Sequence, residues 1–124
     1  MAGFFQPVDN KDANGNYILN KAKAGSTIPL KFSLGGNQGL NIFEAGYPKV
    51  STVPCNADPN ADLIEEYATA TVSGLKYDST VNPPIGQYIY NWKTDSKWAS
   101  QCRSLILKLS DGTPPHRADF NFFK

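Results

Sequence analysis

The chain contains few of the residues that most often perform catalysis or bind metals. Its 124 residues include one histidine and two cysteines. A Ser-His-Asp triad needs a base beside an activated nucleophile, but His116 follows Pro114-Pro115 and no serine lies in a nucleophile-elbow sequence. The two cysteines lack the paired close spacing of structural zinc sites. The sequence therefore predicts a protein that is not an enzyme and that holds no cofactor or zinc ion.

The sequence also has no excess of charge of one sign and no long apolar run. Lysine and arginine total 12 residues against 11 acidic ones, and the formal net charge is +1. Scattered, balanced charge gives no reason to expect nucleic-acid binding. No apolar run approaches the roughly 20 residues that a membrane-spanning helix needs, so we expect no membrane span. With 40% hydrophobic residues, the chain suffices for one core, and we expect residues 1–124 to form a single domain.

What the sequence does contain is a strongly alternating aromatic segment between Gly86 and Cys102. Successive side chains of a strand point to opposite faces of its sheet. One face of this strand therefore carries three aromatic residues, Tyr88, Tyr90 and Trp92. The other face carries Ile89, Asn91 and Lys93. We expect the aromatic face to be buried.

Short strand-like segments separated by turn-forming residues occur along the whole chain. The Asn14-Gly15 dipeptide is the strongest of the turn signals. Without a sustained helical period, this pattern predicts an all-β fold, an antiparallel two-sheet β-sandwich with about seven to nine strands. The expected strands are Phe4–Val8, Tyr17–Asn20, Thr27–Leu34, Tyr47–Val53, Leu63–Ala70, Leu75–Tyr77, Gln87–Thr94, Ser104–Leu109 and Arg117–Phe123.

The two cysteines, Cys55 and Cys102, lie far apart in the sequence, each just outside a strand-like segment. They are either unrelated free thiols or a disulfide that joins two sheets or two loops. The disulfide, which is the interpretation that we favour, needs an oxidising compartment. Because the closed loop is long, the chain-entropy treatment gives a stabilisation of about 4 kcal/mol.

The chain resembles the bacterial PxKF domain, an immunoglobulin-like module named for the motif that reads Pro29-Leu30-Lys31-Phe32 here. The polar turn at residues 11–16 departs from the usual loop of that family. The resemblance implies a non-catalytic accessory module at the C-terminal end of a larger secreted bacterial protein, with Cys55 paired to Cys102 and no established ligand. Further similar segments are 3–10, 23–26, 32–40, 92–95, Trp98, 102–103 and 109–113.

The sequence suggests two kinds of ligand, calcium and carbohydrate, and each of the patterns also has a simpler explanation. Asn10, Asp12 and Asn14 copy the first half of a calcium-binding loop, but Lys21 stands where an acidic residue should close it. This half-match is not enough for a calcium site, and a plain Asn-Gly turn is the interpretation that we favour for this segment. Carbohydrate binding needs exposed aromatic rings, because sugar rings stack on them. We expect Trp92 to lie in the core. The possible ligand-binding residues are therefore Trp98, Tyr47 and Tyr77.

From the sequence we therefore expect a non-catalytic immunoglobulin-like module that is secreted or displayed on the cell surface. Its role would be that of a spacer, a surface-display domain or a protein-contact domain. Its partners would be other domains of the parent protein or a cell-surface partner. The alternative is a carbohydrate-binding module that uses exposed aromatic residues to bind a polysaccharide.

Overall fold

The structure is a computed structural model that describes residues 3–11, 14–15, 17–55, 74–83 and 85–124. The described part is all-β, and its elements are strands apart from one short 3-10 helix. The strands are β1 (Leu19–Lys23), β2 (Thr27–Phe32), β3 (Lys49–Val53), β4 (Leu75–Asp78), β5 (Gln87–Lys93), β6 (Cys102–Leu107) and β7 (His116–Phe123). The helix, η1 (Ser96–Trp98), lies between β5 and β6.

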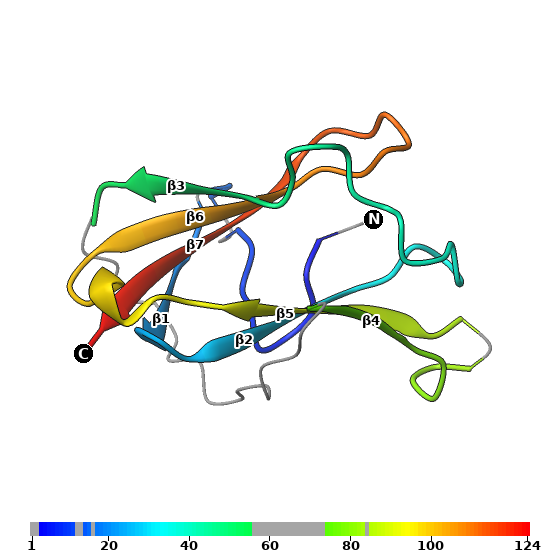
Figure 1. Cartoon of the computed structure of the whole chain (residues 1–124), viewed down its shortest axis with the longest axis horizontal. Coiled ribbons are helices and arrows are strands. Elements are labelled where there is room, and N and C mark those ends of the chain that lie inside the picture. The colour runs from blue at the N-terminus through cyan, green and yellow to red at the C-terminus, as the bar shows by residue number, and fades with distance from the viewer. Residues whose placement is uncertain (1–2, 12–13, 16, 56–73, 84) are drawn as a thin grey trace.

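The strands form two layers that face each other (Figure 1). One layer is a four-stranded sheet in the order β1-β7-β6-β3, and the other is a three-stranded sheet in the order β2-β5-β4. This arrangement confirms the predicted two-sheet β-sandwich. The prediction that the strands are antiparallel is wrong for one pair, because β1 runs parallel to β7. Short turn residues carry the chain from β1 into β2, which lies in the opposite sheet, so β1 lies beside the last strand instead of beside β2.

The strand order is that of an immunoglobulin-like sandwich. In that fold the second, fourth and fifth strands share one sheet, and the third, sixth and seventh share the other. Here β2, β4 and β5 form one sheet, while β3, β6 and β7 lie together in the other. A single antiparallel bridge between Phe5 and Lys31 places the N-terminal segment beside β2, where the first immunoglobulin strand lies.

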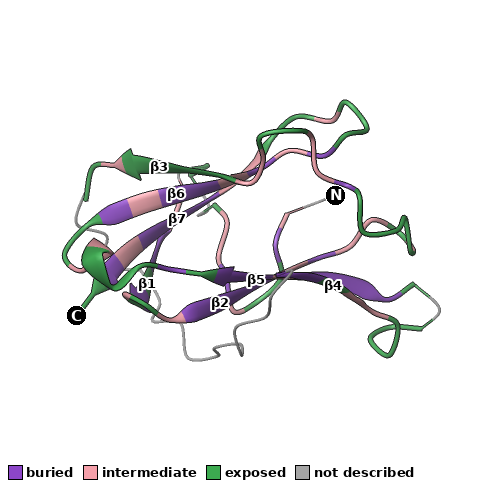
Figure 2. Cartoon of the chain, in the orientation of Figure 1, coloured by how far each residue is buried: buried purple, intermediate pink, exposed green. Residues whose placement is uncertain are grey.

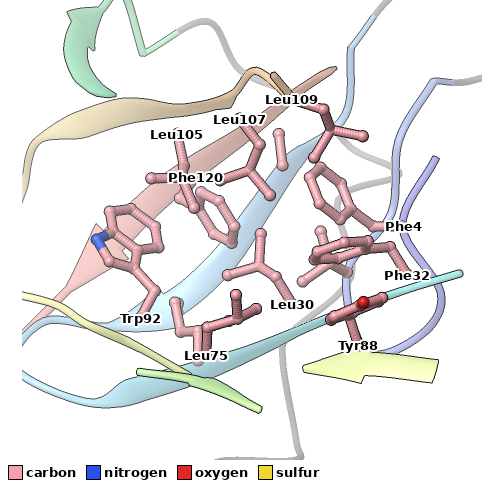
Figure 3. Close-up of a cluster of buried hydrophobic side chains, with 14 of the residues drawn as sticks. Phe4, Leu30, Phe32, Leu75, Tyr88, Trp92, Leu105, Leu107, Leu109 and Phe120 are labelled. Carbon is pink, nitrogen blue, oxygen red and sulfur yellow. The ribbon is translucent and has the colours of Figure 1, made fainter. Parts of the chain in front are cut away.

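The core lies between the two sheets and is rich in aromatic rings (Figure 3). The ring of Trp92 on β5 contacts Phe120 on β7, with 5.1 Å between the ring centroids. Tyr88 stacks on Phe32 of the neighbouring β2 at 5.5 Å. Figure 2 shows that buried positions recur along β2, β5, β6 and β7. On β7, the alternating residues Ala118, Phe120 and Phe122 are all buried.

The prediction that β5 has one buried face is incomplete. Ile89 and Asn91, expected on the outward face, are 9% and 7% exposed, and so this face is also shielded. The register explains part of this burial, because Ile89 lies between Lys31 of β2 and Lys76 of β4, whose long aliphatic stems can cover it. Tyr90, expected on the buried face, is only half-buried.

Two of the predicted strands are not among the strands of the described residues. Phe4–Val8 was expected as a strand, but its pairing is limited to the Phe5–Lys31 bridge. Pro7 within it cannot donate to a ladder, which explains why the pairing does not extend. The predicted strand Leu63–Ala70 lies outside the described residues.

We expect Trp92→Ala to lower the free energy of unfolding by about 3–5 kcal/mol, because it empties a large buried site between the sheets. Chemical denaturation of the wild type and the variant measures this difference. Phe123→Ala on β7 is the control, since Phe123 is exposed and its loss should cost about 1 kcal/mol or less. Equal losses for the two variants would contradict the position of Trp92 in the core.

Candidate functional site

The disulfide is the one covalent crosslink in the described part of the chain. The sulfur atoms of Cys55 and Cys102 lie 2.07 Å apart and their Cα atoms 5.4 Å apart, which confirms the predicted pairing. Its position differs from the expectation that it joins two sheets or two loops. Cys102 begins β6 and pairs in register with Val53, and Cys55 lies two residues after Val53, so the bond ties the end of β3 to the neighbouring strand of the same sheet. It therefore fastens the C-terminal end of the edge strand β3.

Trp98, the first candidate for sugar stacking, is half-buried at the end of η1. Its ring lies 5.8 Å from the ring of Trp92 and 5.6 Å from that of Phe122. The guanidinium of Arg103 lies 5.0 Å from the ring centroid. A shallow hollow of about 560 Å³ lies beside it, lined by Gly25, Lys93, Thr94, Asp95, Ser96 and Trp98. Much of the ring surface that a sugar would use is therefore already in contact with protein.

The other two aromatic candidates also have intramolecular partners. The ring of Tyr77 packs edge-on against Tyr88 at 5.1 Å, and its hydroxyl donates to the carbonyl of Ile85. The Lys49 ammonium lies 4.6 Å from the ring centroid of Tyr47. Tyr77 pairs with the first half of β5, whereas Trp98 follows the other end of that strand. Tyr77 and Trp98 therefore lie at opposite ends of β5 and do not form one platform.

A cleft that no sequence pattern predicted lies between the loop that follows β2 and the turn between β6 and β7. Its volume is about 360 Å³, which is within the range of small-ligand pockets. Buried Ile42 and Leu109 give it an apolar floor, while Asp111 supplies a carboxylate. The remaining lining residues are Leu34, Gln38, Asn41 and Ser110. The Gly35-Gly36 and Asp111-Gly112 turns were the signal in the sequence, but neither indicates that the two loops meet.

The hydroxyl of Tyr88 shapes the loop on one side of this cleft. It accepts a hydrogen bond from the backbone N–H of Gln38 at 2.6 Å and donates to the carbonyl of Gly39 at 2.8 Å. On the other side, Asp111 accepts from the hydroxyl and the backbone N–H of Thr113, and these bonds lower the pKa of the Asp111 carboxyl. One wall of the cleft is therefore fixed by hydrogen bonds to the Tyr88 hydroxyl, and its other side carries the negative charge of Asp111.

The calcium candidates are only partly described. The side-chain oxygen of Asn10 accepts from the backbone N–H of Phe4, and its amide donates to the carbonyl of the same residue. Asn14 is exposed, and Asp12 lies outside the described residues. The bridge between Lys11 and Tyr17 is consistent with the expected tight reversal at Asn14-Gly15. The calcium hypothesis stays a prediction.

A buried carboxylate, Asp119 on β7, is the most enclosed charged group among the described residues. Arg117 donates two hydrogen bonds to it, both at 2.7 Å, and the hydroxyl of Ser104 donates a third. Ser104 thus shares its proton with a carboxylate that an arginine already neutralises, which does not activate the hydroxyl as a nucleophile. In the described ranges, no group of three or more His, Cys, Asp or Glu residues could hold a metal ion.

Comparison with models of protein families, with curated proteins and with solved structures found no match. The similarity to PxKF domains therefore stays a prediction that depends on the motif at Pro29–Phe32 and the segments around it. None of the helices in the part of the chain that the structure describes is long and apolar enough to cross a membrane.

We expect reduction of the disulfide to lower the free energy of unfolding by up to about 4 kcal/mol, as the chain-entropy treatment gives for a crosslink with a sequence separation of 47. Denaturation with and without a reductant measures the loss. The Cys55→Ser/Cys102→Ser double variant should match the reduced wild type and should not respond to the reductant. A wild type that is equally stable in both conditions would contradict this role of the crosslink.

We expect the pKa of His116 to lie below its usual value of about 6.5, because partial burial disfavours the charged imidazole. The folded state then binds the proton less readily than the unfolded state, so the free energy of unfolding falls as the pH drops below about 6.5. NMR titration of the imidazole measures the pKa directly. Denaturation at about pH 7.5 and about pH 5.5 should show a smaller pH effect in His116→Asn than in the wild type.

Proposed function

We propose that the chain is a non-catalytic, extracellular module of the PxKF type, part of a larger secreted bacterial protein, that makes contacts with other proteins or domains. The observation that carries this proposal is the Cys55–Cys102 disulfide across neighbouring strands of an immunoglobulin-like sandwich. A structural disulfide of this kind forms and persists in oxidising compartments. Spacing and surface display are roles that the same module would fulfil in the parent protein.

The contact role is supported by exposed apolar side chains on the loops at one end of the sandwich. Leu40, in the loop after β2, is 58% exposed, and Val81 and Ile85 in the loop between β4 and β5 are also exposed. The two loops are linked through the core. The hydroxyl of Tyr88 donates a hydrogen bond to the carbonyl of Gly39. The ring of Tyr77 packs on Tyr88, and its hydroxyl donates to the carbonyl of Ile85. Apolar side chains gathered at one end of a domain are typical of a protein-contact surface.

The alternative, a carbohydrate-binding module, is weakened by the contacts of its three aromatic candidates. Trp98 is in contact with Trp92, Phe122 and Arg103, so a sugar would have to displace the arginine to stack on the ring. The hollow beside Trp98 keeps this hypothesis testable, since it has room for a sugar ring and carries polar groups.

We expect the chain to remain in solution when it is mixed with insoluble polysaccharides such as cellulose, chitin or xylan. Depletion from the supernatant measures this, with Trp98→Ala as the informative variant and Tyr77→Phe as a variant that keeps its ring. Retention that disappears with Trp98→Ala, while the melting temperature stays unchanged, would favour the carbohydrate alternative.

We expect export of the chain to the bacterial periplasm to give a folded product without titratable thiols, as an extracellular module requires.

A further inference from the structure

The cleft between the loop that follows β2 and the turn between β6 and β7 is lined by residues that the structure describes. Figure 1 shows both segments at the end of the sandwich away from the C-terminus. Within its volume of about 360 Å³, the cleft combines apolar side chains at its floor, neutral amide and hydroxyl groups on its walls, and the Asp111 carboxylate. This combination suits a ligand that has an apolar body and a charged end.

Backbone hydrogen bonds fix the two walls of the cleft relative to each other. The N–H of Ser110 donates to the carbonyl of Ile42 at 2.8 Å, and Phe43 forms a bridge with Leu109. The hydroxyl of Tyr88 accepts a hydrogen bond from the backbone N–H of Gln38 at 2.6 Å. The cleft is therefore preformed, and a ligand that enters it does not have to order its walls.

The floor of the cleft fits an unbranched hydrocarbon stem. Ile42 and Leu109 are buried, and Leu34 beside them is half-buried. Methylene groups that lie on this floor lose contact with water, which favours their binding.

The charge of Asp111 is not matched by a cation among the described residues that line the cleft, because none of them is basic. Lys108, which comes just before Leu109 in the sequence, already pairs with Glu44 at 3.0 Å. The hydrogen bonds from Thr113 stabilise the ionised carboxylate of Asp111 and lower its pKa. The cleft therefore presents a negative charge at neutral pH, and a positively charged group would complement it.

The hydrogen bonds of Asp111 favour an ammonium group over a guanidinium group. The backbone N–H and the hydroxyl of Thr113 both donate to Oδ1, which occupies the two lone pairs of that oxygen. A guanidinium binds best through two parallel bonds to both oxygens, whereas an ammonium is a point charge that Oδ2 alone can accept. The side-chain amides of Gln38 and Asn41, on the other wall, supply acceptors for the remaining ammonium protons.

The exposure of the cleft favours a side chain of a partner protein over a small free molecule. Four of its lining residues are exposed, Gln38, Asn41, Ser110 and Asp111. Sites for small molecules usually enclose most of the ligand. Leu40, which stands between Gln38 and Asn41 and is 58% exposed, offers a larger partner an apolar contact beside the cleft. A side chain that anchors such a partner is typical of protein interfaces.

We propose that this cleft receives a lysine side chain of the protein or domain that the module contacts. Its four-carbon stem would lie on Ile42 and Leu109, and its ammonium would lie beside Asp111. This inference rests on the proposed contact function and adds to it the chemistry of the partner.

NMR titration of the isotope-labelled chain with N-acetyl-lysine methylamide tests the site. At about pH 7.5, His116 is neutral, because partial burial lowers its pKa, and it does not compete for Asp111. We expect the amide signals of Gln38, Ile42 and Ser110 to shift and to saturate with a millimolar dissociation constant. The matching arginine and norleucine derivatives should bind at least about threefold more weakly.

Asp111→Asn removes the charge and keeps an oxygen that can accept from Thr113, so it should weaken binding of the lysine derivative by about threefold to tenfold. Asp78→Asn is the matched control, because Asp78 accepts the same pair of hydrogen bonds from Thr80 but does not line the cleft. The amide spectrum of each variant reports whether the fold is intact. Unchanged binding in Asp111→Asn, or an equal loss in Asp78→Asn, would overturn the proposal.

n-Butylamine distinguishes a partner's lysine from a free amine, since it has the same stem and ammonium without a peptide backbone. We expect it to bind no more tightly than the lysine derivative, and tighter binding would overturn the assignment to a partner protein. A lysine derivative that causes no shifts would overturn the cleft proposal and leave the contact surface at Leu40, Val81 and Ile85 in place. Retention on polysaccharides, in contrast, would contradict the proposed function.

Discussion

The contact between Trp92 and Phe120 is the interaction on which the rest of the structure depends. Trp92 stands on the middle strand of the three-stranded sheet, and Phe120 stands on an inner strand of the other. Phe122 and Trp98 extend this contact to the end of the sandwich, while Tyr88 and Phe32 extend the core in the opposite direction. Large rings bury much apolar surface per residue, which is how a chain of this length can hold two sheets together.

Periodicity predicted the core of this fold well, because two-residue alternation depends only on the strand itself. Two residues of the aromatic face of β5, Tyr88 and Trp92, are buried in the core as expected. What alternation cannot predict is which strands become neighbours. The parallel pairing of β1 with β7 and the burial of Ile89 on the outward face both result from pairing between distant segments. For the same reason the cysteines could be paired from the sequence, but not placed within one sheet.

The candidate sites were harder to predict than the core, because each depends on side chains that the fold brings together from distant parts of the chain. Exposed aromatic residues looked suitable for binding sugars, but the fold gives Trp98 an arginine and two rings as neighbours. Conversely, the cleft near Asp111 is lined by Gln38, whose backbone N–H is bound by the Tyr88 hydroxyl, 50 positions away in the sequence. No local pattern at either loop indicates that contact.

The disulfide and the aromatic core therefore have different roles in the structure. A disulfide between neighbouring strands of one sheet cannot hold the two layers together, so their cohesion comes from the aromatic core. The crosslink fixes the end of β3, one of the two edge strands of the larger sheet, which makes few core contacts of its own because its side chains are largely exposed. Without that bond, the ladder with β6 would be the one strand pairing that holds β3 in the described part of the sheet. A covalent bond is therefore located at a strand whose own side chains contribute little to the core.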